Sequence, residues 1–411
     1  MNKNFTKSEL SNGVRILTER LDHVGSAAIG LWCTTGSTHE SESEAGITHF
    51  IEHMLFKGTE RRTAHQIAEE IEGRGGMLNA FTDKERTCYY CRVLKDDCEI
   101  GFDVLSDMLT HSRLDADDIR LEQGVVLEEI KRSEDEPGDH VHELHTQGLW
   151  DGHKLGLPIL GTRESVSAFD REQLRSYIDR RYKANRIIVT ASGNVNHDDF
   201  HGWAEKALGN LDSDTPDEPL TPPEPTPGQN YIQDDVEQVH FCIGTEGSSH
   251  YGQNFYPLIV LDGVLGGGMS SRLFQEIREK RGLAYAIGSY MLSYTAGGSF
   301  TIYGGTGLQT WQLVQDTIRA ELDKIIKDGP TEAEVAKVKR QIAGNLVLGL
   351  ESTNSRMMRM AKNEIVHGRQ IPIEETVDKI NAVTVEQIQA LGQNIFAPER
   401  MRVTAILPSS A

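Results

Sequence analysis

Hydrophobic residues recur with helical spacing in the segment GITHFIEHMLFKGT, residues 46 to 59. Successive residues of an α-helix turn by about 100°, so apolar positions at i, i+3, i+4, i+7 and i+8 form one stripe. The residues at this spacing are Ile47, Phe50, Ile51, Met54 and Leu55. The pattern predicts a short helix that is anchored by this stripe and ends near Gly58.

Other segments read as strands or as longer helices. Short runs rich in β-branched and aromatic residues indicate strands, as in AAIGLWCTT, RIIVTASG, GSFTIYGG and MRVTAIL. Helical periodicity marks TAHQIAEEIEG, REQLRSYIDRRY and TEAEVAKVKRQIAGNLVLGLE. Helices and strands alternate irregularly and no tight βαβ glycine fingerprint occurs, which predicts an α+β fold with helices packed on one sheet per domain.

The chain is expected to form two domains. Its 411 residues exceed what one hydrophobic core usually supports, which is about 250 to 300 residues. The stretch DSDTPDEPLTPPEPTPGQ, residues 212–229, holds six of the thirteen prolines and predicts a linker between domains at 1–211 and 230–411. Residues 69–81 also align without gaps to 275–287, which indicates a duplicated domain.

Composition and charge limit the kinds of molecule that the protein is expected to bind. A formal charge of −20 argues against nucleic acid, and any steering by charge would favour basic peptides, although the acidity can equally serve solubility alone. Five cysteines, an odd number, suit a reducing compartment. The start of the chain lacks an apolar signal region and no uncharged run is long enough for a bilayer, so we expect a cytoplasmic protein without a membrane partner.

Two patterns could bind metal through cysteine or histidine but have ordinary structural explanations. Cys88 and Cys91 form a CxxC within a predicted strand, where residues three apart point to opposite faces. The segment DHVHELH carries His142 and His145 at a spacing of i, i+3, without a glutamate placed to act as a base. We therefore expect neither pattern to hold a functional metal.

The polar side of the first helix carries a stronger signal. His49 and His53 lie one turn apart, so both imidazoles can reach one Zn²⁺, and Glu52 beside them can hold a water molecule. This HxxEH order is a signature of zinc hydrolases. The alternative is a solvated helix face that carries two histidines by chance, and a zinc site would need a third ligand elsewhere.

The segment that contains this motif resembles part of a known protein family. GITHFIEHMLFKGT is similar to the zinc helix of the pitrilysin/insulinase family of inverted zinc metallopeptidases, which includes mitochondrial processing peptidase. The resemblance implies that Glu129 is the third ligand and that Glu122 orients a ligand histidine. Residues seven apart on a helix differ by about 20° in direction, so these two would share a face, whereas the competing Glu128 would point about 100° away from Glu122.

The resemblance extends over nearly the whole chain. It implies that Arg278 and Tyr285 bind substrate carbonyls and the oxyanion, whereas their residue types alone fit a surface charge and a half-buried strand residue. It also implies that GGMLNAFT, residues 75 to 82, is an edge strand to which a peptide can add, with Gly76, Asn79 and Ala80 near the substrate.

The resemblance implies two similar domains, each a mostly antiparallel sheet with helices on one face, and a zinc-dependent endopeptidase acting on unfolded peptides. In this reading Glu52 is the general base, and a homodimer forms a clamshell whose sites combine the N-terminal domain of one chain with the C-terminal domain of the other. The alternatives are a non-catalytic structural or assembly subunit of the same fold, and a subunit active only with a different partner chain.

Overall fold

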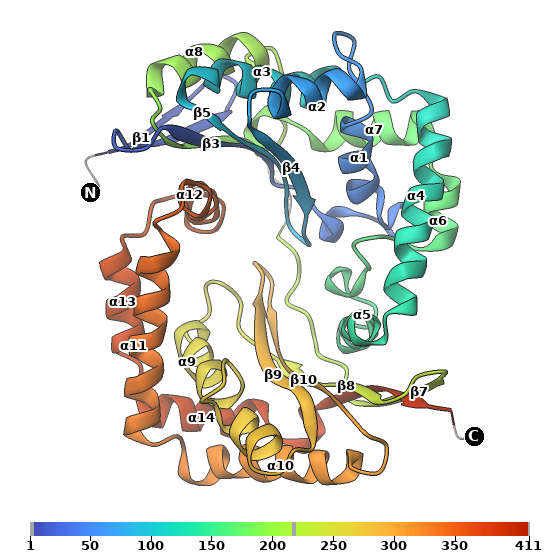
Figure 1. The fold of residues 1–411 in the computed structure, drawn as a ribbon, viewed down its shortest axis with the longest axis vertical. Helices are drawn as coiled ribbons and strands as arrows, with labels where there is room; N and C mark the ends of the chain where they lie inside the picture. Colours follow the sequence, from blue (N-terminus) through green and yellow to red (C-terminus); the bar gives the residue numbers. More distant parts are fainter. Residues whose placement is uncertain (1–3, 216–218, 410–411) are drawn as a thin grey trace. The chain divides into compact units, whose positions relative to one another are not determined.

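A computed structural model describes residues 4–215 and 219–409 of the chain (Figure 1). The chain divides into two compact units. Unit 1 comprises the described parts of 1–130, 157–217 and 347–372, and unit 2 comprises those of 131–156, 218–346 and 373–411. Each unit contains one β-sheet and its own hydrophobic core.

The sheet of unit 1 has six strands in the order β1-β2-β6-β3-β5-β4. Neighbouring strands are antiparallel except for the parallel pair β2 and β6. Strand β4 is therefore an edge of this sheet, with only β5 beside it. The strands are β1 (Phe5–Glu9), β2 (Arg15–Arg20), β3 (Ser26–Cys33), β4 (Met77–Thr82), β5 (Thr87–Leu94) and β6 (Ile187–Gly193).

The sheet of unit 2 has five strands in the order β7-β11-β8-β10-β9. Its one parallel pair is β7 with β11, and β9 is an edge strand. The strands are β7 (Gly228–Asp234), β8 (Val239–Glu246), β9 (Ala284–Ser293), β10 (Gly298–Thr306) and β11 (Arg402–Pro408).

The two sheets have the same topology. If β1 is set aside, the order β2-β6-β3-β5-β4 corresponds strand for strand to β7-β11-β8-β10-β9, including the position of the parallel pair. The aligned segments 69–81 and 275–287 lead into the equivalent edge strands β4 and β9. The predicted α+β class with two similar, mostly antiparallel domains is confirmed.

Helices cover one face of each sheet and bury the two main cores. In unit 1 these are α1 (Ile47–Leu55), α2 (Ala64–Glu72), α3 (Cys98–His111), α4 (Ala116–Asp135), α6 (Arg163–Ala168), α7 (Arg171–Arg181) and α8 (His197–Leu208). In unit 2 they are α9 (Phe255–Leu265), α10 (Trp311–Asp328), α11 (Glu332–Gly349), α13 (Ile373–Asn381) and α14 (Val385–Ile395), with a π-helical segment at Phe274–Glu279.

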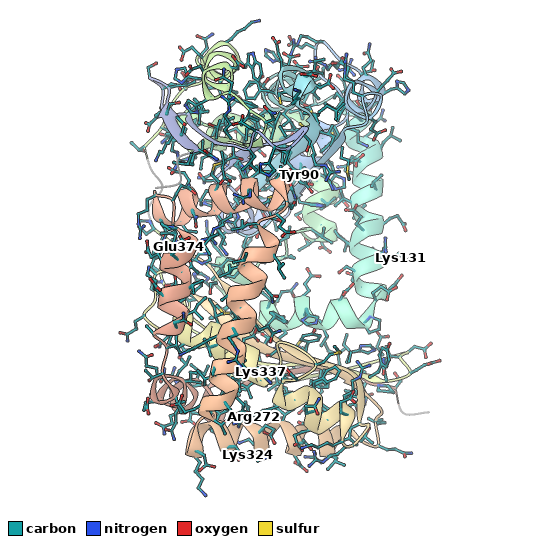
Figure 2. All side chains as sticks on the ribbon, turned by 60° about the vertical axis from the view of Figure 1, so that its left-hand side comes forward. Tyr90, Lys131, Arg272, Lys324, Lys337 and Glu374 are labelled. Carbon is teal, nitrogen blue, oxygen red and sulfur yellow. The ribbon has the colours of Figure 1, made fainter. Side chains whose placement is uncertain are left out.

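One helix also covers the second face of each sheet, and it comes from the other half of the sequence. Helix α12 (Thr353–His367) lies beside β3 (Figure 1). It packs Met357 and Met360 on Trp32 of β3, with Tyr90 of β5 at the margin of this cluster (Figure 2). Helix α5 (Pro137–Leu149) packs Val141 on Cys242 of β8. Relative to the predicted halves, the two units thus exchange residues 131–156 and 347–372.

A glycine admits each exchanged helix close to its sheet. A Cβ atom at Gly30 of β3 would lie 2.7 Å from Sδ of Met357. A Cβ atom at Gly244 of β8 would collide with the imidazole of His145 on α5. In both sheets, a glycine on a central strand leaves the room that the second helix needs to pack closely.

Ion pairs fasten α12 to the sheet of unit 1. Glu364 is 2% exposed and binds Nζ of Lys7 at 2.8 Å and Nη1 of Arg15 at 3.3 Å. A second pair joins Nη1 of Arg356 to Oε1 of Glu19 at 2.8 Å. Removing one partner from the buried Glu364 would leave its charge poorly compensated, so these contacts select the docked position of α12.

Within the described residues, no helix is both long enough and apolar enough to cross a membrane.

The packing of α12 predicts a large cost for emptying its contact. Met357 is fully buried, so Met357→Ala should lower the free energy of unfolding by about 2–5 kcal/mol through lost burial and a cavity. Urea unfolding followed by Trp fluorescence measures this change. The control Met269→Ala removes a side chain that is 76% exposed and should change stability by less than about 0.5 kcal/mol. Equal midpoints for the two variants would contradict the described packing.

Candidate metal centre

Helix α1 carries the candidate metal ligands His49 and His53, and its apolar side is buried as the sequence pattern predicts. Ile47, Phe50, Ile51, Met54 and Leu55 are each no more than 1% exposed. The first turn is held by the buried carboxylate of Glu40, which accepts hydrogen bonds from the backbone N–H groups of Gly46 at 2.8 Å and Thr48 at 2.9 Å. Glu40 and α1 both belong to unit 1, and these two hydrogen bonds restrain the first turn of the helix against shifting or rotating.

Three side chains of unit 1 converge beside α1. Oε2 of Glu129, on α4, lies 3.8 Å from Nε2 of His49 and 3.6 Å from Nε2 of His53. One possible ligand atom from each of the three residues lies within 4.8 Å of the others. Among the described residues, no other group of three or more His, Cys, Asp or Glu side chains has its ligand atoms this close together. Glu128 is not part of the group.

The spacing of these atoms fits a zinc ion. Ligands about 2.0–2.1 Å from a tetrahedral zinc stand roughly 3.3 Å from one another, so small movements of the three side chains would bring them to bonding distance. Two imidazoles and one carboxylate are a ligand set of catalytic zinc sites, where the fourth position stays open. The residues present therefore fit the metal that the sequence predicts.

A buried carboxylate orients one of the histidines. Nδ1 of His53 lies 2.7 Å from Oε1 of Glu122, which is 3% exposed and also pairs with Nζ of Lys57. An ionised Glu122 accepts the Nδ1–H, which leaves the lone pair of Nε2 directed toward Glu129. Glu122 thus fixes the ring and its tautomer in the state that a metal requires.

The surroundings of the two histidines shift their pKa values in opposite directions. Burial and the neighbouring His53 lower the pKa of His49 to about 4, so its ring is neutral at pH 7. Burial also acts to lower the pKa of His53, but the hydrogen bond to Glu122 and the charge of Glu129 outweigh it and raise the pKa. The carboxylates on α4 therefore favour the protonated form of His53, and binding of zinc would displace the proton on Nε2 while Glu122 keeps the one on Nδ1.

Glu52 lies next to this group on α1. Burial raises its pKa, although a hydrogen bond from the Thr82 hydroxyl, 2.6 Å from Oε2, acts in the opposite direction. Thr82 is the last residue of β4. The edge strand and the carboxylate predicted to act as a base are therefore in direct contact.

The predicted peptide-binding residues lie on or just before this edge strand. Asn79 and Ala80 belong to β4 and pair with Tyr90 and Tyr89 of β5, and Gly76 precedes the strand. A Cβ atom at Gly76 would lie within 3.0 Å of both Ile71 and the carbonyl of Arg92, so only glycine fits this approach. The place of the strand agrees with its predicted role, which stays a prediction.

Arg278 and Tyr285 belong to unit 2 and contact each other. The Arg278 guanidinium carbon lies 4.9 Å from the centre of the Tyr285 ring and 4.8 Å from that of Phe274. Arg278 lies in the π-helical segment, and Tyr285, on β9, is 83% exposed. The two residues form one surface feature with a phenol open to solvent, and their part in catalysis stays a prediction.

Other groups of potential ligands have structural roles. His145 is 1% exposed and lies 3.2 Å from the Thr404 hydroxyl, and Nδ1 of His142 lies 2.8 Å from the Tyr290 hydroxyl, so both help to pack α5 on its sheet. Cys88 and Cys91 point to opposite faces of β5, one into the α12 cluster and the other into the main core. Burial raises the pKa of both thiols, which makes them poor ligands or nucleophiles.

A cavity of about 530 Å³ lies in unit 2 at the junction of α10 and α11. Most of the charged side chains that line it form ion pairs with one another. Two of its basic residues are Arg272 and Lys324 (Figure 2). Arg272 binds both carboxylate oxygens of Glu334 at 2.8 Å, and Nζ of Lys324 binds Glu321 at 2.5 Å. These pairs leave little unmet charge to attract a ligand.

Three residues of the centre are not predicted from the sequence. Lys57 lies one turn beyond His53, so its position gave a signal for pairing with a carboxylate, but many surface lysines share that signal. Thr82 lies in a strand and Glu40 in a loop, and the sequence pattern around them does not predict that either residue contacts α1. Only the folded chain shows that each contacts this helix.

Comparison with known proteins agrees with this geometry. Residues 15–163 match the family described as Insulinase (Peptidase family M16), and residues 168–342 match the Peptidase M16 inactive domain. An uncharacterized zinc protease of Bacillus subtilis is 42% identical over 398 residues, covering 97% of each chain. One of Mycobacterium leprae is 39% identical over 395 residues, covering 95% of this chain and 89% of that protein.

Solved structures share the fold across the full length. A protease from Helicobacter pylori has a TM-score of 0.91 at 20% identity, covering 98% of this chain and 99% of that one. A peptidase M16 inactive domain from Pseudomonas fluorescens has the same score and identity, with 99% of both chains covered. The matches to the two family models and the curated relatives establish that the chain belongs to the insulinase family of peptidases, family M16.

Proposed function

We propose that this protein is a zinc-dependent endopeptidase that cleaves unfolded peptides. The observation that carries the proposal is the convergence of His49, His53 and Glu129 within 4.8 Å, with Glu52 beside them. The names of the curated relatives, which call them zinc proteases, support the same metal and the same class of reaction.

His49, His53 and Glu129 would hold the metal. A zinc ion in such a site supplies Lewis acidity and lowers the pKa of water toward about 7. Glu122 keeps the Nδ1–H of His53 occupied, so that Nε2 remains available as a ligand. Glu52 would accept the proton of the attacking water and return it to the departing amine.

The substrate would be an extended chain. The open edge of β4 offers main-chain hydrogen-bonding groups to a peptide that adds as a further strand, an interaction with little dependence on sequence. Folded proteins rarely present a free strand, so this mode favours unfolded peptides. The net charge of −20 would favour basic ones.

We also propose that the active protein is a homodimer with shared sites. Arg278 and Tyr285 form an exposed pair that can bind a carbonyl and donate a hydrogen bond to an oxyanion. In the proposed dimer, the zinc ligands of one chain meet this pair from its partner. Each site then needs an intact unit 1 and an intact unit 2 from different chains.

Loss of the base should abolish turnover without loss of metal. Glu52→Gln keeps the size of the side chain but cannot accept a proton, so kcat for a quenched basic peptide should fall by about 10²- to 10⁴-fold. Zinc content should stay at the wild-type level, and a chelator should inactivate the wild type. The exposed Glu128→Gln serves as the matched control. Cleavage by Glu52→Gln at the wild-type rate, or a wild-type protein that binds no zinc, would refute the peptidase proposal.

Loss of the orienting carboxylate should weaken metal binding. Glu122→Gln replaces an acceptor of the His53 Nδ1–H with an amide of the same shape, and the affinity for zinc should fall by about 10- to 100-fold. Competition with a chromogenic chelator measures this change. An unchanged affinity would mean that Glu122 does not act through His53.

Mixing inactive variants tests the shared sites. In a 1:1 mixture of Glu52→Gln and Arg278→Ala, exchange of subunits would give half of the dimers one intact site, which restores about a quarter of the wild-type activity. A mixture of Glu52→Gln with Glu129→Gln should restore nothing, because both changes lie in unit 1. If the first mixture also stays inactive while subunits exchange, each site belongs to one chain.

A further inference from the structure

Thr82 links the edge strand to the predicted base. Its Oγ1 lies 2.6 Å from Oε2 of Glu52, a distance typical of a strong hydrogen bond to a carboxylate. Glu52 lies on α1 and Thr82 ends β4, so this contact joins the helix of the metal ligands to the strand predicted to bind substrate.

The direction of this hydrogen bond follows from Glu52, because an ionised carboxylate can only accept. Thr87 pairs with Thr82 across β4 and β5, is fully buried, and donates its hydrogen to the carbonyl of Thr35 at 2.9 Å. Its oxygen lies 3.5 Å from Oγ1 of Thr82. The much shorter distance to Glu52 shows that the Thr82 hydroxyl donates its hydrogen to that carboxylate rather than to Thr87.

We propose that Thr82 is a positioning residue, which holds the Glu52 carboxylate in one orientation and links that orientation to the place of β4. This proposal rests on the proposed peptidase function. The hydrogen bonds of the Thr82 side chain go to Glu52 and Thr87 and not to a metal ligand, so its effect should reach catalysis through Glu52.

Three substitutions test the role. Thr82→Val removes the hydroxyl from a side chain of nearly the same shape, and kcat should fall by about 10- to 100-fold with KM and zinc content unchanged. Thr82→Ser keeps the hydroxyl and should retain kcat within about threefold. The control Thr110→Val removes a hydroxyl that bonds the helical carbonyl of Ser106 and should leave kcat unchanged.

A measurement without turnover accompanies the kinetics. In zinc-free protein labelled with ¹³C at the glutamate carboxyl carbons, the signal of Glu52 is the one lost in Glu52→Gln. It should shift in Thr82→Val and keep its place in Thr82→Ser, because only the valine variant changes the hydrogen bond to the carboxylate.

The outcomes separate this proposal from the peptidase proposal. If Glu52→Gln is inactive but Thr82→Val has the wild-type kcat, or if the serine variant loses as much as the valine variant, the positioning role is wrong and the peptidase stands. A rise in KM without a fall in kcat also overturns the role. If Glu52→Gln cleaves at the wild-type rate, the peptidase proposal itself fails.

Discussion

The proposed centre depends on how α4 packs against α1. Val126 of α4 is fully buried in the main core, and Glu122 and Glu129 lie one turn before it and about one turn after it on the same side of the helix. Burial of Val126 therefore aims both carboxylates at α1. One reaches Nδ1 of His53 and the other approaches Nε2, so a single helix carries both the proposed third ligand and the group proposed to orient the second.

Duplication of the fold has not duplicated the centre. Helix α9 corresponds to α1 by its place before the equivalent edge strand, yet its sequence FYPLIVLDGVL contains no histidine and buries Leu258 and Leu261. Unit 2 instead carries Arg278 and Tyr285 at its edge strand. The two repeats thus share one topology and differ in chemistry, as expected if unit 1 supplies the metal ligands and unit 2 supplies groups for substrate.

Local patterns predicted the parts of the structure that depend on nearby residues. The apolar stripe of α1 and the shared face of Glu122 and Glu129 follow from helical geometry, and the place of Glu129 came from resemblance to the family. Exchange of α5 and α12 was not predicted, because amphipathic spacing shows that a helix packs but not on which sheet. The contact of Thr82 with Glu52 also joins distant segments, and a threonine in a strand gives no sign of it.

The central claim is that Glu129, far from the histidines in sequence, completes a zinc site with His49 and His53. Titration of metal-free protein with zinc against a competing chelator tests it most directly, in the wild type, Glu129→Gln and Glu128→Gln. The account predicts one tight site per chain in the wild type and in Glu128→Gln, and a loss of tight binding in Glu129→Gln alone. Tight binding that survives Glu129→Gln, or is lost in Glu128→Gln instead, would contradict it.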